Sequence, residues 1–311
     1  MAPSPVKTSG AAHVLAIGEC MAELAPAETE HTYGLGFAGD TFNTAWYLAQ
    51  HAPNTRVSYF TALGCDTISD NMAAFFRKSG IDDAHVQRIE TKTVGLYLIS
   101  LDKGERSFSY WRGQSAARDM VRDPAHLMRA IAQADILYLS GITLAILDSA
   151  SQDLLLSALQ DARSAGKTIM FDPNLRPRLW SSPEEMCEVI MRGAAVSDIA
   201  LPSFEDEATW FGDADLEATA ARYQNVGVST VIVKNGEGSI HYVSGDETGD
   251  IAVEPAPVVV DTTAAGDSFN AGFLAGYLQG KPLADCILQG SALARQVIQA
   301  KGALVSVNVP A

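Results

Sequence analysis

The sequence lacks the cysteine spacings that hold metal ions or form redox pairs. Its four cysteines, Cys20, Cys65, Cys187 and Cys286, lie far apart, and no two of them are spaced as CxxC. This spacing excludes zinc ribbons and thioredoxin-type motifs. Widely separated thiols in a chain of 311 residues suit a reducing compartment better than a disulfide framework does. We therefore expect a cytoplasmic protein.

Long hydrophobic runs and positive charge are also scarce. The most apolar stretch, residues 136–147, is interrupted by Ser140, Gly141 and Thr143, whereas a membrane span takes ~20 apolar residues. The first ten residues, MAPSPVKTSG, contain no apolar core of a signal peptide. With 37 acidic and 22 basic residues, the net charge is −15, which argues against nucleic-acid or anionic-membrane partners. An anionic small-molecule substrate would need local cations.

Two nucleotide-binding motifs are absent as well. No GxxxxGK[ST] sequence occurs, so the chain is not a P-loop protein. No GxGxxG follows the first apolar run, where Gly18-Glu19-Cys20-Met21 stands instead. This difference argues against a nicotinamide-dependent oxidoreductase.

Short apolar runs alternate with helical patterns along the chain, and 47% hydrophobic residues allow a sizeable core. We expect strands at residues 13–17, 56–62, 136–139, 168–171, 199–201 and 230–233, and helices at 43–50, 69–79 and 150–165. This alternation predicts a single α/β domain over residues 1–311, with a mainly parallel central sheet flanked by helices on both faces. The oligomeric state is left open, a homo-oligomer included.

One region departs from this rhythm. Residues 93–101 and 106–112 are two strand-like runs joined by Asp102-Lys103-Gly104-Glu105, a pattern that predicts a hairpin. Together with residues 19–37 the hairpin could form a small antiparallel sheet over the main one, acting as a lid. An edge hairpin of the core is the alternative.

The sharpest local pattern is DTTAAGDSF at residues 261–269. A valine run at 258–260 predicts a strand that enters a turn of small residues, after which a helix starts. Small side chains let backbone N–H groups at a helix N-terminus approach an anion closely. Asp267 lies at that terminus, where a carboxylate can also be a simple helix cap.

This stretch resembles the DTTGAGD signature of the ribokinase-like carbohydrate kinases. The resemblance implies that Ala264, Ala265 and Gly266 form an anion hole for the transferred phosphoryl group. It also implies that Asp267 contacts the sugar and is the base that takes the proton from its hydroxyl. Ala264 stands where the family has glycine, so we expect an ordinary backbone conformation there, because alanine tolerates positive φ poorly.

A second signature, Gly39-Asp40-Thr41-Phe42-Asn43, precedes the first helix. By itself it is typical of a turn and a capped helix. It also resembles the GG-x-x-x-N pattern of the same family, with Ala38 in place of the first glycine. The resemblance, which extends over residues 13–305, implies that Gly39, Asp40 and Asn43 bind the sugar.

Several stretches resemble the 2-keto-3-deoxygluconate kinases within this family. They are GECMAEL (18–24), GLY (95–97), FSYWR (108–112), LYLSGITLAIL (137–147) and FDPNLRPRLW (171–180). This resemblance implies that Tyr97, Tyr110, Arg112 and Arg176 hold an acid sugar, and an arginine fork suits a carboxylate. The alternatives are tyrosines packed within a hairpin and arginines solvated at the surface. FDPNLRPRLW also resembles fructokinases.

The segment VIVKNGEGS (231–239) resembles the part of the family that contacts ATP, although Asn-Gly-Glu-Gly alone is typical of a hairpin turn. The resemblance implies an ATP site formed by Lys234, Asn235, Gly236, Gly238, Ser239, Ala265, Gly266 and, from a helix over 288–300, Ser291. Where the family has N-x-x-E, this chain has Ser203 and Asp206. Asp206 is thus a candidate outer-shell ligand of Mg²⁺, or part of a solvated acidic helix start.

These resemblances together imply an ATP- and Mg²⁺-dependent kinase that phosphorylates 2-keto-3-deoxygluconate at O6. A fructokinase or ribokinase-type enzyme is the alternative within the same class. A non-catalytic sugar or nucleoside sensor on the same fold is the alternative outside it. The intact Asp267 argues against the sensor, which would have no need of a base.

Overall fold

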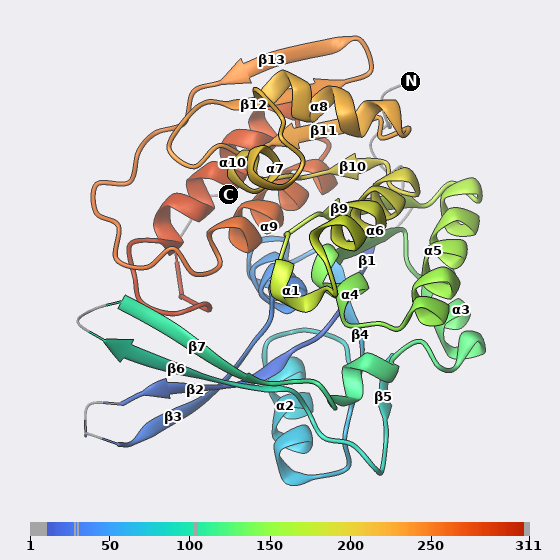
Figure 1. Ribbon diagram of the computed structural model, residues 1–311, viewed down its shortest axis with the longest axis vertical. Coiled ribbons are helices and arrows are strands. Elements are labelled where there is room, and N and C mark those ends of the chain that lie inside the picture. Colours follow the sequence, from blue (N-terminus) through green and yellow to red (C-terminus); the bar gives the residue numbers. More distant parts are fainter. Residues whose placement is uncertain (1–10, 28, 30, 103–104, 308–311) are drawn as a thin grey trace.

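The computed structural model describes residues 11–27, 29, 31–102 and 105–307 (Figure 1). The first ten residues, which the sequence predicts are not a signal peptide, lie outside this part. So do Lys103 and Gly104 in the predicted hairpin turn. Within the described residues, no helix combines the length and the apolar character needed to cross a membrane.

A large sheet forms the centre of the described part of the chain. Its nine strands run in the order β13-β12-β11-β10-β9-β8-β1-β4-β5. Neighbours from β11 to β5 pair in parallel, whereas β12 and β13 are antiparallel additions at one edge. The strands are β1 (His13–Ile17), β4 (Arg56–Leu63), β5 (Val86–Arg88), β8 (Ile136–Ser140), β9 (Thr168–Asp172), β10 (Ile199–Ala200), β11 (Thr230–Val233), β12 (Ile240–Ser244) and β13 (Glu247–Ile251).

Helices cover both faces of this sheet (Figure 1). One face carries α1 (Asp40–His51), α2 (Thr67–Lys78), α9 (Ala265–Leu278) and α10 (Leu283–Val297). The other carries η1 (Ala116–Asp119), α3 (Pro124–Gln133), α4 (Gly141–Ala145), α5 (Ser149–Ser164), α6 (Pro183–Ala195), α7 (Phe204–Trp210) and α8 (Leu216–Asn225), while η2 (Pro177–Leu179) follows β9. Successive side chains of β1 point to opposite faces of the sheet: Val14 and Ala16 pack against the first set of helices, and Leu15 and Ile17 pack against the second.

A small second sheet projects from the body of the molecule (Figure 1). It consists of β2 (Met21–Pro26), β3 (Tyr33–Ala38), β6 (Leu96–Asp102) and β7 (Glu105–Trp111), in the order β3-β2-β6-β7. The hairpin β6–β7 is antiparallel, but β2 and β6 pair in parallel. The expectation of a wholly antiparallel sheet is therefore wrong, because β2 and β6 are joined through much intervening chain rather than by a turn.

The mainly parallel α/β architecture predicted from the sequence is confirmed, and β1 and β11 begin and end at the predicted residues. The strand predicted at Val258–Val260 is wrong. These three side chains are 48–58% exposed, and the segment forms no strand. The high strand propensity of valine has no effect here because no neighbouring strand offers a ladder of hydrogen bonds.

Candidate active site

The turn before α9 differs from the conformation expected of an alanine. Ala264 is the N-cap of this helix and adopts the left-handed conformation, with φ 61° and ψ 18°. The expectation of an ordinary backbone there is wrong. The reason lies in packing: Ala264 contacts the apolar cluster of the small sheet, which includes Met21, Tyr97 and Ile99. Partial burial of its methyl group against this cluster offsets part of the strain of a positive φ.

We expect Ala264→Gly to change the free energy of unfolding by less than about 1 kcal/mol. Glycine relieves a left-handed strain of roughly 1–2 kcal/mol, but it loses a partly buried methyl worth at most ~0.8 kcal/mol and gains freedom in the unfolded chain. Ala264→Val, β-branched at a positive φ, should lose about 1–3 kcal/mol. Urea denaturation measures both; a glycine variant more stable by over ~2 kcal/mol would contradict the offset.

Asp267, in the first turn of α9, is buried and faces residues 39–43, the segment predicted to bind the sugar and here called the predicted sugar loop. Its Oδ2 accepts a hydrogen bond of 2.7 Å from Asn43 Nδ2, and its carbonyl oxygen accepts one of 3.1 Å from Thr44 Oγ1. Both partners lie on α1, so the two sequence signatures meet in space. Burial, together with the charge of nearby Asp40, raises the pKa of Asp267 to about 8, and the hydrogen bond from the Asn43 amide opposes this shift.

This raised pKa predicts the pH dependence of catalysis. A base accepts a proton only when ionised, and below its pKa the ionised fraction of Asp267 falls tenfold per pH unit. We therefore expect kcat/KM for the sugar to rise with pH and to level off above about pH 8, where the Asp267 carboxyl of the free enzyme is ionised. A coupled assay over a range of about pH 5 to 10 measures this. A flat profile down to about pH 5 would contradict the assignment of Asp267 as the base.

A polar network extends from Asp267 towards the ends of β9 and β11. Lys234 Nζ donates to Asp172 Oδ1 at 3.4 Å and to Asn270 Oδ1 at 3.3 Å, and Asn270 Nδ2 donates to Asp172 Oδ2 at 2.8 Å. Sequence reasoning singled out Lys234 but missed Asp172 and Asn270. The sequence does mark both residues: Asp172 lies inside the FDPNLRPRLW stretch, and Asn270 is a polar residue within an otherwise apolar helical run.

The predicted sugar loop, residues 39–43, is held against neighbouring chain segments. Asp40 Oδ2 accepts from Asn174 Nδ2 at 2.9 Å, and the Gly39 N–H donates to Asn43 Oδ1 at 3.3 Å. A Cβ at Gly39 would lie 2.2 Å from the carbonyl oxygen of Glu19, so the loop approaches too closely for any other residue. Burial raises the pKa of Asp40. Asn174 is a further residue that the sequence reasoning missed.

Arg112, which directly follows strand β7 of the small sheet, is paired with a carboxylate. It forms an ion pair with Glu19, and their side chains are 10% and 1% exposed. Arg112 Nε and Glu19 Oε1 are buried without a hydrogen-bond partner among the described residues. Glu19 therefore already neutralises the charge of the Arg112 guanidinium, while the Nε–H group of Arg112 still has no acceptor in the described part of the chain.

The two predicted tyrosines differ in environment. Tyr97 is buried and donates its hydroxyl hydrogen to Glu23. Tyr110 is 52% exposed, and its ring centroid lies 5.9 Å from that of Tyr97. Tyr97 thus belongs to the packed base of the small sheet, whereas Tyr110 offers an exposed ring above it.

Among the described residues, Arg176 pairs with Asp206 and not with a residue of the small sheet. Its guanidinium Nη1 is 3.8 Å from Asp206 Oδ2, and the side chains are 52% and 36% exposed. No hydrogen bond or ion pair joins it to the small sheet within the described part of the chain. The structure therefore does not pair Arg176 with Arg112 and places it beside the candidate magnesium ligand.

A cleft of about 440 Å³ lies on the other side of α9. Of the residues predicted to bind ATP, six line it, whereas Gly238 and Ser239 do not; the six are Lys234, Asn235, Gly236, Ala265, Gly266 and Ser291. Val259, Thr262 and Phe269 also line it and were not singled out as ligands. The hairpin turn predicted at residues 234–239 is present as well, because β11 and β12 form an antiparallel hairpin around it.

The N-terminal turn of α9 separates this cleft from the sugar loop. Ala265 N–H donates to the carbonyl oxygen of Thr262 at 3.2 Å, whereas the following N–H groups of a helix's first turn have no intrahelical acceptor. Gly266 and Lys234 are close together, since a Cβ on this glycine would lie 3.5 Å from the lysine Nζ. Backbone donors and a cation thus face one region of the cleft.

Carboxylates gather near this region. Burial raises the pKa of Asp206, Asp172 and Glu205 raise it further, and Arg176 and Lys234 oppose the rise. Glu205 lines the cleft predicted to bind ATP, and carboxylate oxygens are ligands that fit Mg²⁺. Asp206 therefore remains a candidate outer-shell ligand.

Comparison with known proteins defines the class that this fold and site represent. The family model described as pfkB family carbohydrate kinase matches residues 11–309. The chain belongs to that family, and the ribokinase-like fold and the carbohydrate-kinase class predicted from the sequence are confirmed.

Particular relatives refine this placement. The chain is 43% identical over 301 residues to the 2-dehydro-3-deoxygluconokinase of Haemophilus influenzae, covering 93% of this chain and 94% of that protein. It is 41% identical over 300 residues to the enzyme of the same name from Escherichia coli K12, covering 94% and 96%. A PfkB protein from Polaromonas sp. JS666 superposes with a TM-score of 0.81 at 29% identity, covering 93% and 96%.

Proposed function

We propose that this protein transfers the terminal phosphoryl group of ATP to O6 of 2-keto-3-deoxygluconate, the same compound as 2-dehydro-3-deoxygluconate. The observation that carries the proposal is the position of Asp267, hydrogen-bonded to Asn43 of the sugar loop and adjacent in sequence to Gly266 in the nucleotide cleft. A base at this junction can reach a hydroxyl while the phosphoryl donor lies across the turn. Relatives 41–43% identical over nearly the whole chain support the substrate.

The groups present can perform an in-line transfer. Asp267 accepts the proton of the O6 hydroxyl, O6 forms a bond to the γ-phosphorus, and the bond to the β–γ bridging oxygen breaks to release ADP. The Asn43 amide holds the carboxylate in place. Backbone N–H groups at the start of α9, with Lys234, stabilise charge on the transferring group, which is where most of the rate acceleration of phosphoryl transfer arises.

Mg²⁺ is part of the proposal. Asp206 would supply an outer-shell ligand, and the charge of Asp172 contributes to the raised pKa of Asp206. When bound, the ion would neutralise charge on the phosphates. Asp172 would in addition keep Lys234 in position through their ion pair.

The sugar acid would lie between the sugar loop and the small sheet, which acts as a lid. Gly39, Asp40 and Asn43 would face the hydroxyl groups, while Tyr110 and Arg112, with Tyr97 in the base of the small sheet, would face the sugar acid from the lid side. Arg176, beside Asp206, would approach the substrate from the nucleotide side. Four unpaired cysteine thiols support a reducing, cytoplasmic location.

A screen of ADP release tests the substrate. It would compare 2-keto-3-deoxygluconate, its 4-epimer 2-keto-3-deoxygalactonate, fructose and ribose. We expect the first to be the best substrate and the epimer to come next, because it keeps the carboxylate and changes one hydroxyl. Fructose turned over equally well would favour a fructokinase-type enzyme with the same base. Sugar binding without ADP release would favour a sensor.

A further inference from the structure

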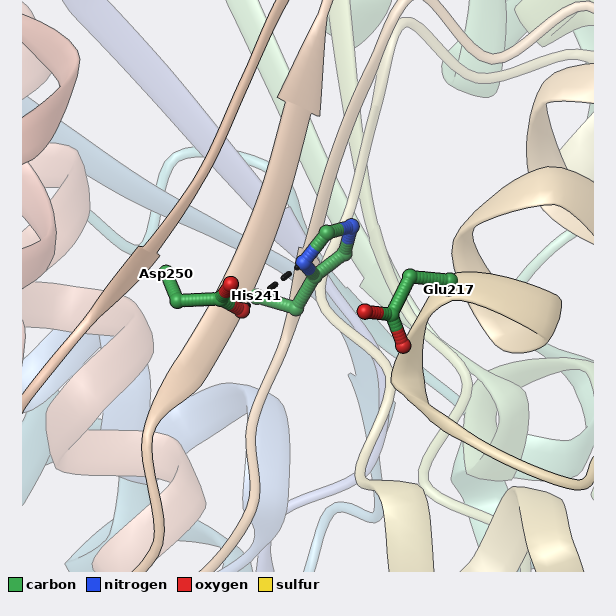
Figure 2. Close-up of side chains that lie close together, drawn as sticks. All are labelled: Glu217, His241 and Asp250. Atoms are coloured by element: carbon green, nitrogen blue, oxygen red, sulfur yellow. Dashed lines mark hydrogen bonds and ion pairs between the residues drawn. The ribbon is translucent and has the colours of Figure 1, made fainter.

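A cluster of three potential metal ligands lies at the antiparallel edge of the large sheet. Glu217 is in the first turn of α8, His241 is on β12 and Asp250 is on β13. His241 and Asp250 are directly opposite each other in the antiparallel register. Figure 2 shows both carboxylates directed towards the imidazole ring, one from the helix and one from the strand.

The atoms are close enough to share one ion. His241 Nδ1 is 2.9 Å from Asp250 Oδ1, and one ligand atom from each of the three residues lies within 4.8 Å of the others. The histidine is 5% exposed, whereas both acids are exposed. The site therefore has a fixed nitrogen donor at its base and two adjustable oxygen donors at its mouth.

The charges at this place are unbalanced. Within the residues that the structure describes, neither Glu217 nor Asp250 has a lysine or arginine partner, and Asp250 contacts the His241 imidazole through a hydrogen bond, which a neutral ring can also make. Two carboxylates gathered on one imidazole repel each other unless a cation lies between them. One imidazole nitrogen with two carboxylate oxygens suits zinc and neighbouring first-row ions, while Mg²⁺ prefers an all-oxygen set.

We propose that Glu217, His241 and Asp250 bind one divalent first-row transition ion, with zinc as the expected ion and water completing its coordination. The ion would link α8 and the edge strand β13 to β12. Ile240, next to His241 in the sequence, and Val253, shortly after Asp250, both line the nucleotide cleft. Binding would stabilise this part of the cleft without supplying a group to the transfer reaction.

The test is a zinc titration of metal-stripped protein by isothermal calorimetry, carried out in a Cys65→Ser background because Cys65 is exposed and could bind zinc on its own. We expect one saturable site, and a thermal unfolding midpoint that rises with zinc concentration as ligand linkage requires. His241→Asn, which keeps a hydrogen-bonding group opposite Asp250, should abolish both effects. The exposed Glu217→Gln should weaken binding by about tenfold or more, the scale of a lost ligand interaction.

His51→Asn, a histidine at the end of α1 outside the cluster, serves as the matched control and should bind zinc as the background protein does. Unchanged unfolding midpoints of the metal-free variants would show that they remain folded. The proposal is overturned if zinc does not bind, or if binding persists in both His241→Asn and Glu217→Gln. Zinc binding seen with Cys65 intact and lost in the Cys65→Ser background also overturns it.

Discussion

Asp267→Asn is expected to lower kcat by ~10²–10⁴-fold, the usual loss on removing a general base, while leaving the KM values for sugar acid and ATP within about threefold, because an amide makes nearly the same contacts. The introduced amide is isosteric with the carboxylate, and its oxygen can still accept from the Asn43 amide. A coupled assay with purified protein measures both quantities. Retention of more than about a tenth of the wild-type kcat would mean that another group takes the proton.

The same substitution should stabilise the protein in a pH-dependent way. Because the folded-state pKa of Asp267 is raised from 3.8 to about 8, the fold favours the neutral form, and wild-type stability falls as pH rises through this interval. The amide carries no charge at any of these pH values. The stability advantage of Asp267→Asn should therefore be absent below about pH 4, grow up to about pH 8 and then remain constant.

Asp148→Asn is the matched control for both measurements. Asp148 caps α5 by accepting from the Ser151 N–H, so it is also an aspartate at a helix start, but hydrogen bonding to its carboxylate lowers its pKa. We expect this variant to keep its kcat and to show no stability gain at high pH. A loss of activity without any stability gain in Asp267→Asn would point to a distorted site rather than to a removed base.

The second large effect concerns substrate preference. We expect kcat/KM for 2-keto-3-deoxygluconate to exceed that for fructose by at least ~100-fold, the scale of one lost charged hydrogen bond. The reason is not an unpaired positive charge, because Glu19 already neutralises Arg112. A neutral sugar would instead leave the buried Nε of Arg112, which has no acceptor among the described residues, without one.

Single substitutions separate the two arginines. Arg112→Ala and Arg176→Ala should each raise KM for the keto acid by on the order of 10–150-fold, which corresponds to ~1.5–3 kcal/mol, with a smaller change in KM for ATP. The double mutant Arg112→Ala/Glu19→Gln, compared with each single variant, separates the loss of the Arg112 hydrogen bonds from the effect of leaving Glu19 buried without its partner. Equal losses towards both substrates would indicate misfolding for Arg112, or a phosphate contact for the more exposed Arg176 next to Asp206.

The local pattern of the chain is sufficient to predict its architecture and to locate the two signature segments, residues 39–43 and 261–269. The sequence predicts strands β1 and β11 to the residue, since short apolar runs bounded by turn residues leave few alternatives. Gly39 and Asp267 can be identified as site residues because glycine and small-residue turns next to helix starts have restricted uses. Magnesium and lid roles remain predictions from that pattern.

Tertiary structure alone decided the features that depend on residues far apart in the chain. The left-handed Ala264 packs against the small sheet, and the ion pair of Arg112 with Glu19 joins the segments that follow β7 and β1, which are far apart in the sequence. The raised pKa of Asp267 likewise depends on burial and on Asp40. Desolvation and through-space charge act over distances in space, and spacing along the sequence contains no measure of them.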